Sequence, residues 1–499
     1  MNKKYILLPM ILLSAYFCVT VMTGCSSRKE KSDILNGGYW RDQGLNEVIP
    51  FWQKHVIDTV NGGYYLNLSR EGEPLPPFDK HPAMTGRQIY AFCCAYLLSG
   101  KEEYLRTAEM GVNYLIDHAW DKEYGGWFDL LDEKGNPKIE TKTVPNQLYT
   151  DVGLAEYYFV TGDKRVLEKI YASLKIRKTF AKDTVNGGYF QSLNRDLSVA
   201  DSSKSKHSHY GYTSSLLLNM MLFTHDREVE EFGRELMDLS IENMRDEYAW
   251  FRGFPSPDDI KWKISPRYVN GTEAVSAGAQ LTATLSLLRL SEITGDKKYS
   301  DIGISLGRQL INSAYDPSRK VWFDNIGARI PSTPLDTANV WWWLQSYGMF
   351  INLHLYHLTG EKEYIDSFSG MASFWSDHFI DHELGGGFQS VSPSGKVLNT
   401  TKASPWKASY HEMETSLLNY LYLNLYVNLK PVTLYFNISD AEEGEKHYVS
   451  LAEDHSVIID RVIINGKPWS NFDQSGRSVT LPEGKNLKMI VTLKPSGKK

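Results

Sequence analysis

Two histidines, each with a tyrosine close behind or before it, have the side chains that proton transfer needs. His411 follows Tyr410, and Tyr212 stands three residues after His209. A histidine can remove a proton near neutral pH, and a tyrosine hydroxyl can return one to an oxygen that leaves. We therefore expect His411 or His209 to act as the base and Tyr212 or Tyr410 as the acid.

Basic and aromatic side chains accompany these candidates. We expect Arg87 and Lys407 to bind a carboxylate, because a cation stabilises the charge that builds up when a neighbouring proton leaves. Trp343 and Trp406 could stack on sugar rings. Further basic residues could gather at one end of the fold; they are Lys80, His81, Lys204, Lys206, His207, Lys261, Lys263, Arg267 and Lys402. On a chain with a formal net charge of −6, such a cluster predicts an anionic substrate and argues against a general role in nucleic-acid binding.

Carboxylates offer a different chemistry. Glu273 and Asp151 could form the facing pair that glycoside hydrolysis requires, and Glu414 is a further candidate for this site. The sequence contains no glycine-rich phosphate loop and no spacing typical of metal ligands. We therefore expect neither a cofactor nor a metal.

Six repeated units must position these residues. An aromatic hairpin recurs along the chain, and its markers are Tyr64, Trp127, Tyr189, Trp250, Trp322 and Gly387. Short turns such as Ser99-Gly100-Lys101 and Thr294-Gly295-Asp296 fall between the hairpins, with helical periodicity on either side. This pattern predicts a mainly α fold, an (α/α)6 barrel over residues 36–428, with a pocket inside the inner ring. Alternating β-branched residues predict a small antiparallel β domain over residues 429–499.

Three segments of the chain carry a family resemblance. They are Trp406-Lys407-Ala408-Ser409-Tyr410-His411, Arg87-Gln88-Ile89-Tyr90-Ala91-Phe92 and Trp342-Trp343-Leu344-Gln345. Together with the hairpins, they resemble the N-acylglucosamine 2-epimerase and cellobiose 2-epimerase family over residues 36–428. The resemblance implies histidines on different inner helices that remove and return a sugar proton. It also implies an arginine at Arg87, tryptophan walls at Trp343 and Trp406, and the last histidine at His411. Apart from the resemblance, the further candidates for substrate binding are Gln345, Arg267, Glu273, Asp151 and Glu414.

The sequence departs from this family where its second acid–base group should be. Ala279 and Thr282 stand at the positions of a histidine and a glutamate in the fourth unit, and either His209 or Tyr212 matches the histidine of the third unit. Tyr347 and Glu414 replace a glutamate and an arginine of the family. The case for an epimerisation that uses two bases is therefore weakened, whereas an elimination needs only one base and one acid.

The function predicted from these residues is a lyase-type elimination. The substrate would be a terminal uronic acid on an oligosaccharide, and the enzyme would act as a dehydratase in polysaccharide degradation, resembling the ulvan-type branch of algal oligosaccharide dehydratases. A sugar 2-epimerase or aldose–ketose isomerase is the first alternative. A glycoside hydrolase and an inactive sugar-binding protein are the others.

The first residues of the chain predict export. Lys3 and Lys4 precede an apolar stretch, and Thr23-Gly24-Cys25-Ser26-Ser27 is typical of the cleavage site of a lipoprotein signal peptide. We expect residues 1–24 to be removed, Cys25 to be lipidated and residues 25–35 to form a tether. The enzyme would then be anchored in the cell envelope, as a periplasmic or outer-membrane lipoprotein whose contact with the membrane is the lipid alone.

Overall fold

The computed structural model describes residues 34–252, 262 and 266–497. The expected signal peptide, Cys25, Lys261 and Lys263 therefore lie outside the described residues. Within the described part of the chain, no helix is both long and apolar enough to cross a membrane.

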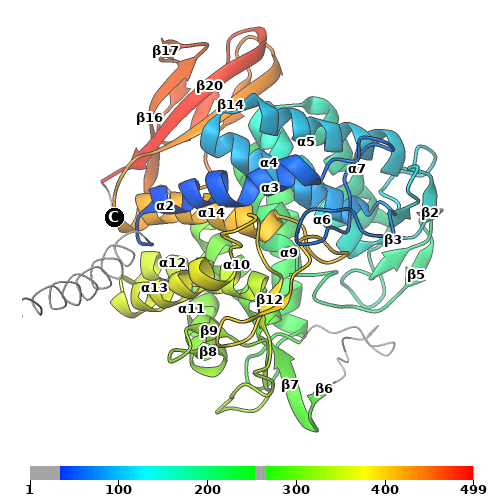
Figure 1. The fold of residues 1–499 in the computed structure, drawn as a ribbon, viewed down its shortest axis with the longest axis vertical. Helices are drawn as coiled ribbons and strands as arrows, with labels where there is room; N and C mark the ends of the chain where they lie inside the picture. Colours follow the sequence, from blue (N-terminus) through cyan, green and yellow to red (C-terminus); the bar gives the residue numbers. More distant parts are fainter. Residues whose placement is uncertain (1–33, 253–261, 263–265, 498–499) are drawn as a thin grey trace, which may run out of the picture.

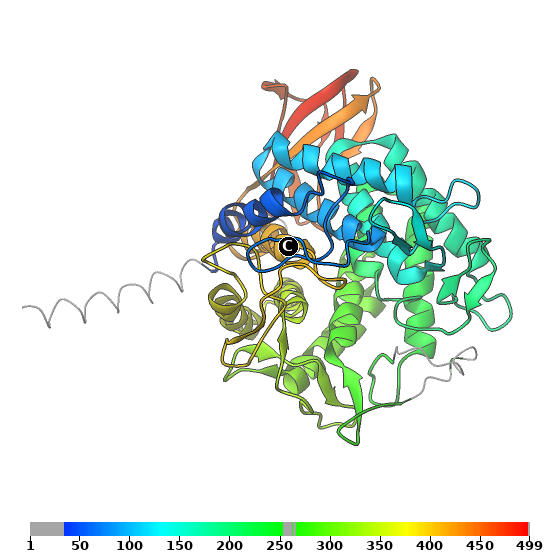
Figure 2. The ribbon, with the colours of Figure 1, turned by 45° about the vertical axis from the view of Figure 1, so that its right-hand side comes forward.

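Helices arranged in two concentric rings form the body of the molecule (Figures 1 and 2). The inner segments are α4 (Pro82–Ser99), α6 (Val144–Thr161), η3 (Thr213–Leu217) with α8 (Leu218–Thr224), α10 (Ala277–Thr294), α12 (Trp342–Thr359) and α14 (Tyr410–Tyr422). The outer segments are α5 (Glu102–Tyr114), α7 (Lys164–Phe180), α9 (Arg227–Asn243), α11 (Lys297–Ala314), α13 (Lys362–His378), and α2 (Gly37–Gln43) with α3 (Ile49–His55). Short π-helical turns η1 (Gly44–Val48), η2 (Leu115–Ala119) and η5 (Leu423–Val427) extend three of the helices. This is the predicted (α/α)6 barrel.

Burial separates the two rings. In α4, every residue from Pro82 to Leu98 is buried, because both the pocket side and the outer side of the helix are covered. Helix α9 buries only one face, which carries Val229, Phe232 and Leu236, and its other face is charged. A helix that is buried all round must lie inside, and one with a single apolar stripe must lie outside.

The turn between the two helices of a unit depends on backbone geometry. Gly100, Gly162, Gly295 and Gly360 end inner helices in the left-handed conformation, at φ 64 to 75°, where a side chain is unfavourable. Asp163, Asp226 and Asp296 then cap the next helix with their carboxylates. In the turn motif, the glycine thus ends the inner helix and the following aspartate begins the outer one.

Buried Asp–Lys pairs hold the hairpins. Asp58 accepts hydrogen bonds from the backbone N–H groups of Val60 and Asn61 at 2.9 and 3.0 Å, and from Lys80 Nζ at 2.6 Å. The same arrangement recurs in three other units, where the pairs are Asp121–Lys142, Asp183–Lys204 and Asp381–Lys402, at 2.8 to 3.0 Å. None of these eight side chains is more than 4% exposed. The prediction that Lys80, Lys204 and Lys402 form a basic mouth is therefore wrong, because each is buried against its own aspartate.

Short strands complete the barrel loops. They are β1 (Leu130–Leu131), β2 (Pro137–Ile139), β3 (Lys142–Thr143), β4 (Ser192–Leu193), β5 (Val199–Asp201), β6 (Arg267–Val269), β7 (Thr272–Ser276), β8 (Tyr315–Asp316), β9 (Val321–Trp322), β10 (Asn325–Gly327), β11 (Val340–Trp341), β12 (Ser390–Val391) and β13 (Val397–Asn399). Sheets such as β3-β4-β5 and β11-β12-β13 join the strand that leads into one inner helix to the hairpin of the following unit. The loops at this end of the barrel are thereby fixed to one another.

Seven strands after the last helix lie outside the ring, on one side of it (Figures 1 and 2). One antiparallel sheet has the order β14 (Val432–Ala441), β20 (Gly484–Pro495), β16 (Val457–Ile464) and β17 (Lys467–Trp469), and the other has the order β15 (Lys446–Tyr448), β19 (Ser478–Thr480) and β18 (Phe472–Asp473). His447 Nε2 lies 2.8 Å from the carbonyl oxygen of Phe159, and Phe436 packs on the ring of Phe159. These strands therefore contact the barrel where its inner helices end.

The first and last helices of the barrel are neighbours. A Cβ at Gly37 would lie 2.6 Å from the carbonyl oxygen of Tyr420, so α2 approaches α14 too closely for a side chain there. Arg70 binds Asp381 at 2.8 Å. The ring is closed through these contacts.

Candidate active site

A cavity of about 670 Å³ opens at the N-terminal ends of the inner helices. Each of the six units contributes a side chain to its wall; they are Arg87, Tyr149, Thr282, Tyr347 and His411 from inner helices, and Tyr212 from the position just before η3. The other lining residues that matter for binding are His81, Asn146, Lys206, His207, Arg267, Asp324, Trp341, Trp342, Trp343 and Trp406. The cavity therefore lies where the sequence predicted it, at the end of the barrel reached by the connecting loops.

His411 is the titratable group best placed for proton transfer. Its Nδ1 lies 2.9 Å from Glu414 Oε2, and the Tyr410 hydroxyl donates to Glu414 Oε1 at 3.0 Å. Burial, together with the nearby Arg87 guanidinium, holds the pKa of His411 well below its usual range, so the ring is neutral at pH 7. Burial raises the pKa of Glu414 to about 8. An ionised Glu414 accepts the proton of Nδ1, which leaves Nε2 as a free base.

Aromatic rings enclose His411. The centroids of Trp342 and Tyr347 lie 5.7 Å from that of His411, and the Trp343 centroid lies at 6.4 Å. The indole of Trp343 also covers Gly278, where a Cβ would lie 2.1 Å from it. These rings exclude water from the imidazole and offer flat apolar surfaces to a sugar.

The wall beside His411 continues with a guanidinium and a hydroxyl. Arg87 Cζ lies 3.5 Å from the centre of the Tyr149 ring, and one terminal nitrogen donates to the Trp406 carbonyl at 3.1 Å. The Tyr212 hydroxyl is 3.2 Å from His207 Nδ1. Burial, with the charges of Lys206 and Arg87, lowers the pKa of His207 to about 3, so this ring is also neutral. Tyr212 and His207 are therefore both neutral at rest, and the Tyr212 hydroxyl can donate a hydrogen bond to His207 Nδ1.

A third part of the wall mixes charges. Asp324 caps α10, since its Oδ1 accepts from Ser276 Oγ at 2.7 Å and from the Gly278 N–H at 3.0 Å. Burial lowers the pKa of Lys206, while Asp324 opposes that shift. Arg267 lines the same region from β6. Of the basic residues expected at the mouth, His81, Lys206, His207 and Arg267 do reach the cavity.

Four predicted residues are held away from the cavity by other partners. His209 places Nδ1 3.0 Å from the Ser205 carbonyl oxygen and accepts the Tyr189 N–H at Nε2, so both ring nitrogens are engaged by backbone groups of the third unit. Gln345 accepts from the backbone N–H of Trp322 and donates to its carbonyl oxygen. Lys407 Nζ is paired with Glu412, and Tyr410 donates to Glu414. These side chains support the architecture of the site and do not line it.

The two carboxylates considered for hydrolysis do not face each other across the cavity. Asp151 is fully buried in the second unit, where it accepts from Trp127 Nε1 and Ser173 Oγ at 2.8 and 2.6 Å. Burial raises the pKa of Asp151 to about 8. Glu273 is paired with Arg252 on the β6–β7 hairpin. Neither residue belongs to the cavity lining, so the geometry gives no support to this pair.

The sequence interpretation missed Tyr149 and Asp324. A signal for Tyr149 was present, because Arg87, Tyr149, Thr282 and Tyr347 are each the sixth residue of their inner helix, and Trp343 and His411 are each the second. Residues four apart share one face of a helix. The second and sixth positions therefore both point into the barrel.

Known proteins share this fold and parts of this sequence. The model of the N-acylglucosamine 2-epimerase (GlcNAc 2-epimerase) family matches residues 63–151 and 329–415. The cellobiose 2-epimerase of Bacteroides fragilis is 24% identical over 383 residues, which cover 73% of this chain and 93% of that protein. The N-acylglucosamine 2-epimerase of Bos taurus is 25% identical over 390 residues, which cover 74% and 88% of the two chains. The crystal structure of a D-mannose isomerase superposes with a TM-score of 0.69 at 18% identity, over 78% of this chain and 98% of that one. This chain is therefore similar in sequence to the N-acylglucosamine 2-epimerase family and shares the barrel fold of sugar epimerases and isomerases.

Proposed function

We propose that this enzyme moves a proton at the carbon next to a sugar carbonyl, as an epimerase or isomerase, with His411 as its base. The observation that carries the proposal is the contact between His411 Nδ1 and Glu414, which directs the other ring nitrogen toward the cavity. The names of the relatives, two sugar 2-epimerases and a mannose isomerase, support the same class of reaction.

The geometry favours an isomerisation that uses one base. Epimerisation at one carbon requires one group to remove a proton from one face and another group to return it on the opposite face. Aldose–ketose isomerisation can use a single base, which removes the proton from C2 and delivers it to C1 on the same face. Ala279 stands at the fourth-unit position where the family has a histidine, and His207 on the cavity wall has its Nδ1 against the Tyr212 hydroxyl. The second base of the two-base scheme is therefore missing from its family position.

Arg87 and Tyr212 on the cavity wall can serve the oxygen atoms of the substrate. When C2 loses its proton, negative charge develops on the carbonyl oxygen, and the Arg87 guanidinium is buried on the cavity wall where it can stabilise that charge. Tyr212, in contact with His207, can pass a proton between the two oxygens as the double bond moves. No net proton is gained or lost, as an isomerisation requires.

Isotope labelling tests this proposal. The protein is incubated with mannose, glucose, N-acetylglucosamine and cellobiose carrying deuterium at C2, and products are analysed by mass spectrometry and NMR. We expect a ketose that retains part of the deuterium at C1, and loss of at least 100-fold in rate for His411→Gln at unchanged circular dichroism. A 2-epimer that has lost all label would replace the one-base mechanism with a two-base mechanism. If none of these sugars gives a product or exchanges its C2 deuterium, the proposal is overturned.

A second candidate is the elimination of water from a uronic acid. Arg87, Lys206 and Arg267 on the cavity wall favour it, because they could bind a carboxylate. Its support is narrower than the sequence suggested, since Lys80, Lys204, Lys402 and Lys407 are all committed to buried acidic partners. Oligosaccharides ending in uronic acid separate the two candidates, because elimination produces ultraviolet absorbance and a product lighter by one water.

We also propose that the chain is exported and anchored through Cys25. The lipoprotein-type segment Thr23-Gly24-Cys25-Ser26-Ser27 supports this location. Expressed in a Gram-negative host, the protein should incorporate labelled palmitate and sediment with membranes, and Cys25→Ser should lose both properties. Equal labelling of Cys25→Ser would refute the anchor.

A further inference from the structure

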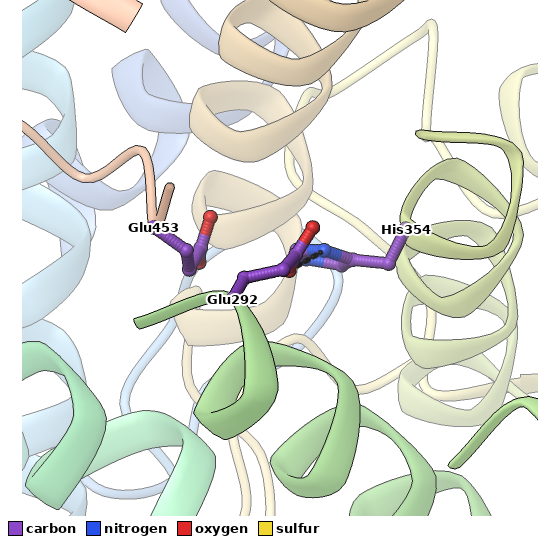
Figure 3. Close-up of side chains that lie close together, drawn as sticks. All are labelled: Glu292, His354 and Glu453. Carbon is purple, nitrogen blue, oxygen red and sulfur yellow. Dashed lines mark ion pairs between the residues drawn. The ribbon is translucent and has the colours of Figure 1, made fainter. Parts of the chain in front are cut away.

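Three ionisable side chains meet at the end of the barrel opposite the cavity (Figure 3). Glu292 comes from α10, His354 from α12 and Glu453 from the segment between β15 and β16. One ligand atom from each lies within 4.8 Å of the other two. Their side chains are at most 1% exposed. Two inner helices and the C-terminal strands thus converge on one buried point.

The cluster contains polar atoms without adequate partners. His354 Nδ1 lies 2.7 Å from Glu292 Oε2, yet neither carboxylate oxygen of Glu292 and neither ring nitrogen of His354 makes a hydrogen bond of acceptable geometry. Buried polar groups are almost always hydrogen-bonded, so four such atoms in one place require an explanation. Burial raises the pKa of Glu292.

Neighbouring charged groups do not supply the missing partners of Glu292 and His354. Arg289 Nε binds Glu453 at 2.6 Å, and the hydroxyls of Tyr422 and Tyr426 also donate to Glu453. This arginine is therefore used by one of the two carboxylates. Glu292 and His354 remain with each other, at a point where a cation can accept an oxygen and a nitrogen together.

A second histidine–carboxylate pair, His357 and Asp454, lies beside this cluster. His357 Nε2 lies 2.7 Å from Asp454 Oδ2 and 3.9 Å from Glu292 Oε1. Its side chain is 16% exposed and that of Asp454 is 27% exposed. This pair can orient Glu292, and it offers a route from solvent to the buried cluster.

We propose that Glu292, His354 and Glu453 bind one divalent transition-metal ion, with Zn²⁺ as the preferred ion. One imidazole nitrogen and two carboxylate oxygens form a donor set that suits zinc. Glu292 stands ten residues after Thr282 of the cavity wall, about 15 Å along the helix at 1.5 Å per residue. The ion is therefore structural: it fastens the C-terminal strands to the inner helices and takes no part in the reaction.

Metal analysis of the full chain tests this site. Protein purified without a metal-affinity tag should retain one zinc per chain, measured by plasma mass spectrometry. After treatment with a chelator, added Zn²⁺ should raise the Tm by roughly 5 °C or more. Co²⁺ added to the same wild-type protein should give the visible absorption of a tetrahedral site with nitrogen and oxygen ligands, a readout that needs no variant.

Two variants and a control identify the ligands. Glu292→Gln and His354→Gln should each retain less than a tenth of the zinc, whereas His382→Gln, which changes an exposed surface histidine, should retain all of it. Unchanged zinc in His354→Gln would overturn the assignment. So would wild-type protein that holds no metal and shows neither a Tm shift nor cobalt absorption, which would leave a buried ion-pair cluster only. None of these measurements depends on the sugar chemistry at the other end of the barrel.

Discussion

The protonation of Glu414 should control the rate of the reaction at His411. When Glu414 is ionised, it accepts the proton of His411 Nδ1 and leaves Nε2 free to act as a base. When Glu414 is protonated, its own hydroxyl donates to Nδ1, and Nε2 carries the proton instead. The burial that raises the pKa of Glu414 to about 8 therefore sets the pH at which the base becomes available.

The size of the change in kcat/KM follows from the pKa of Glu414. At pH 6, two units below the pKa, about 1% of Glu414 is ionised. The kcat/KM for proton removal should rise about tenfold per pH unit from pH 6 and level off above pH 8, to a plateau about 100-fold higher. His411 adds no further change in this range, because its own pKa lies well below 6.5.

Glu414→Gln should reproduce the protonated state at every pH. The amide oxygen can accept from Tyr410 while the amide nitrogen donates to His411, which fixes the unproductive tautomer. We expect kcat/KM at pH 9 to fall about 100-fold or more, with no rise between pH 6 and pH 8. The assay is initial-rate kinetics over pH 5.5 to 9.5, with Asp151→Asn as the matched control, since Asp151 is a buried carboxyl with the same pKa outside the cavity. A wild-type profile that is flat from pH 6 to 8, or an unchanged slope in Glu414→Gln, would refute the reasoning.

Three further predictions concern stability and binding. Lys80→Met should lower the free energy of unfolding by about 3–5 kcal/mol, because it leaves the buried Asp58 carboxylate without its cation, and should leave KM unchanged; a raised KM at unchanged stability in urea titrations would restore the substrate-binding role. Because Asp151 has a pKa of about 8 when folded and an ordinary aspartate pKa of 3.8 when unfolded, the folded state binds a proton that the unfolded state lacks between those values, so its contribution falls by about 1.4 kcal/mol per pH unit as pH rises through this window. Asp151→Asn should therefore be more stable than wild type at pH 8, and the gain should shrink toward pH 5; a gain that is independent of pH in thermal unfolding would contradict this. Trp406, which is 74% exposed beside the cavity, should when changed to Ala alter unfolding by no more than about 0.5 kcal/mol and raise KM more for a disaccharide than for a monosaccharide, an expectation that equal KM changes would disprove.

Local signals made the fold accessible from the sequence. The glycines that end four of the inner helices and those in four of the hairpins mark conformations that few other residues adopt, and together with the aromatic residues of the hairpins their repetition indicated the number and order of units. His411, Arg87 and Trp343 reach the cavity because helix register placed them on its inner face. These features depend on neighbouring residues only.

Long-range pairing made the lysines hard to interpret. A lysine in a loop is usually solvated, and the residues next to Lys80 or Lys402 in the chain do not show that each lysine pairs with a buried aspartate. The missing signal was regular spacing, since Asp58 precedes Lys80 by 22 residues and Asp381 precedes Lys402 by 21. His209 was misplaced for a similar reason, because its partners belong to the Ser205 turn and the Tyr189 hairpin.

The contact between the first and last helices has a consequence for how the chain acquires its structure. In an open array of repeats, each unit can add to the one before it, and the array can be shortened from either end. Here the neighbour of α2 is α14, and Asn428 Nδ2 donates to the Leu35 carbonyl at 2.7 Å, so the earliest helix has no complete packing surface until residues near 428 have emerged from the ribosome. The ring can therefore close only after the last unit is made, and deletion of residues 34–43 should remove this closing contact as surely as deletion of α14.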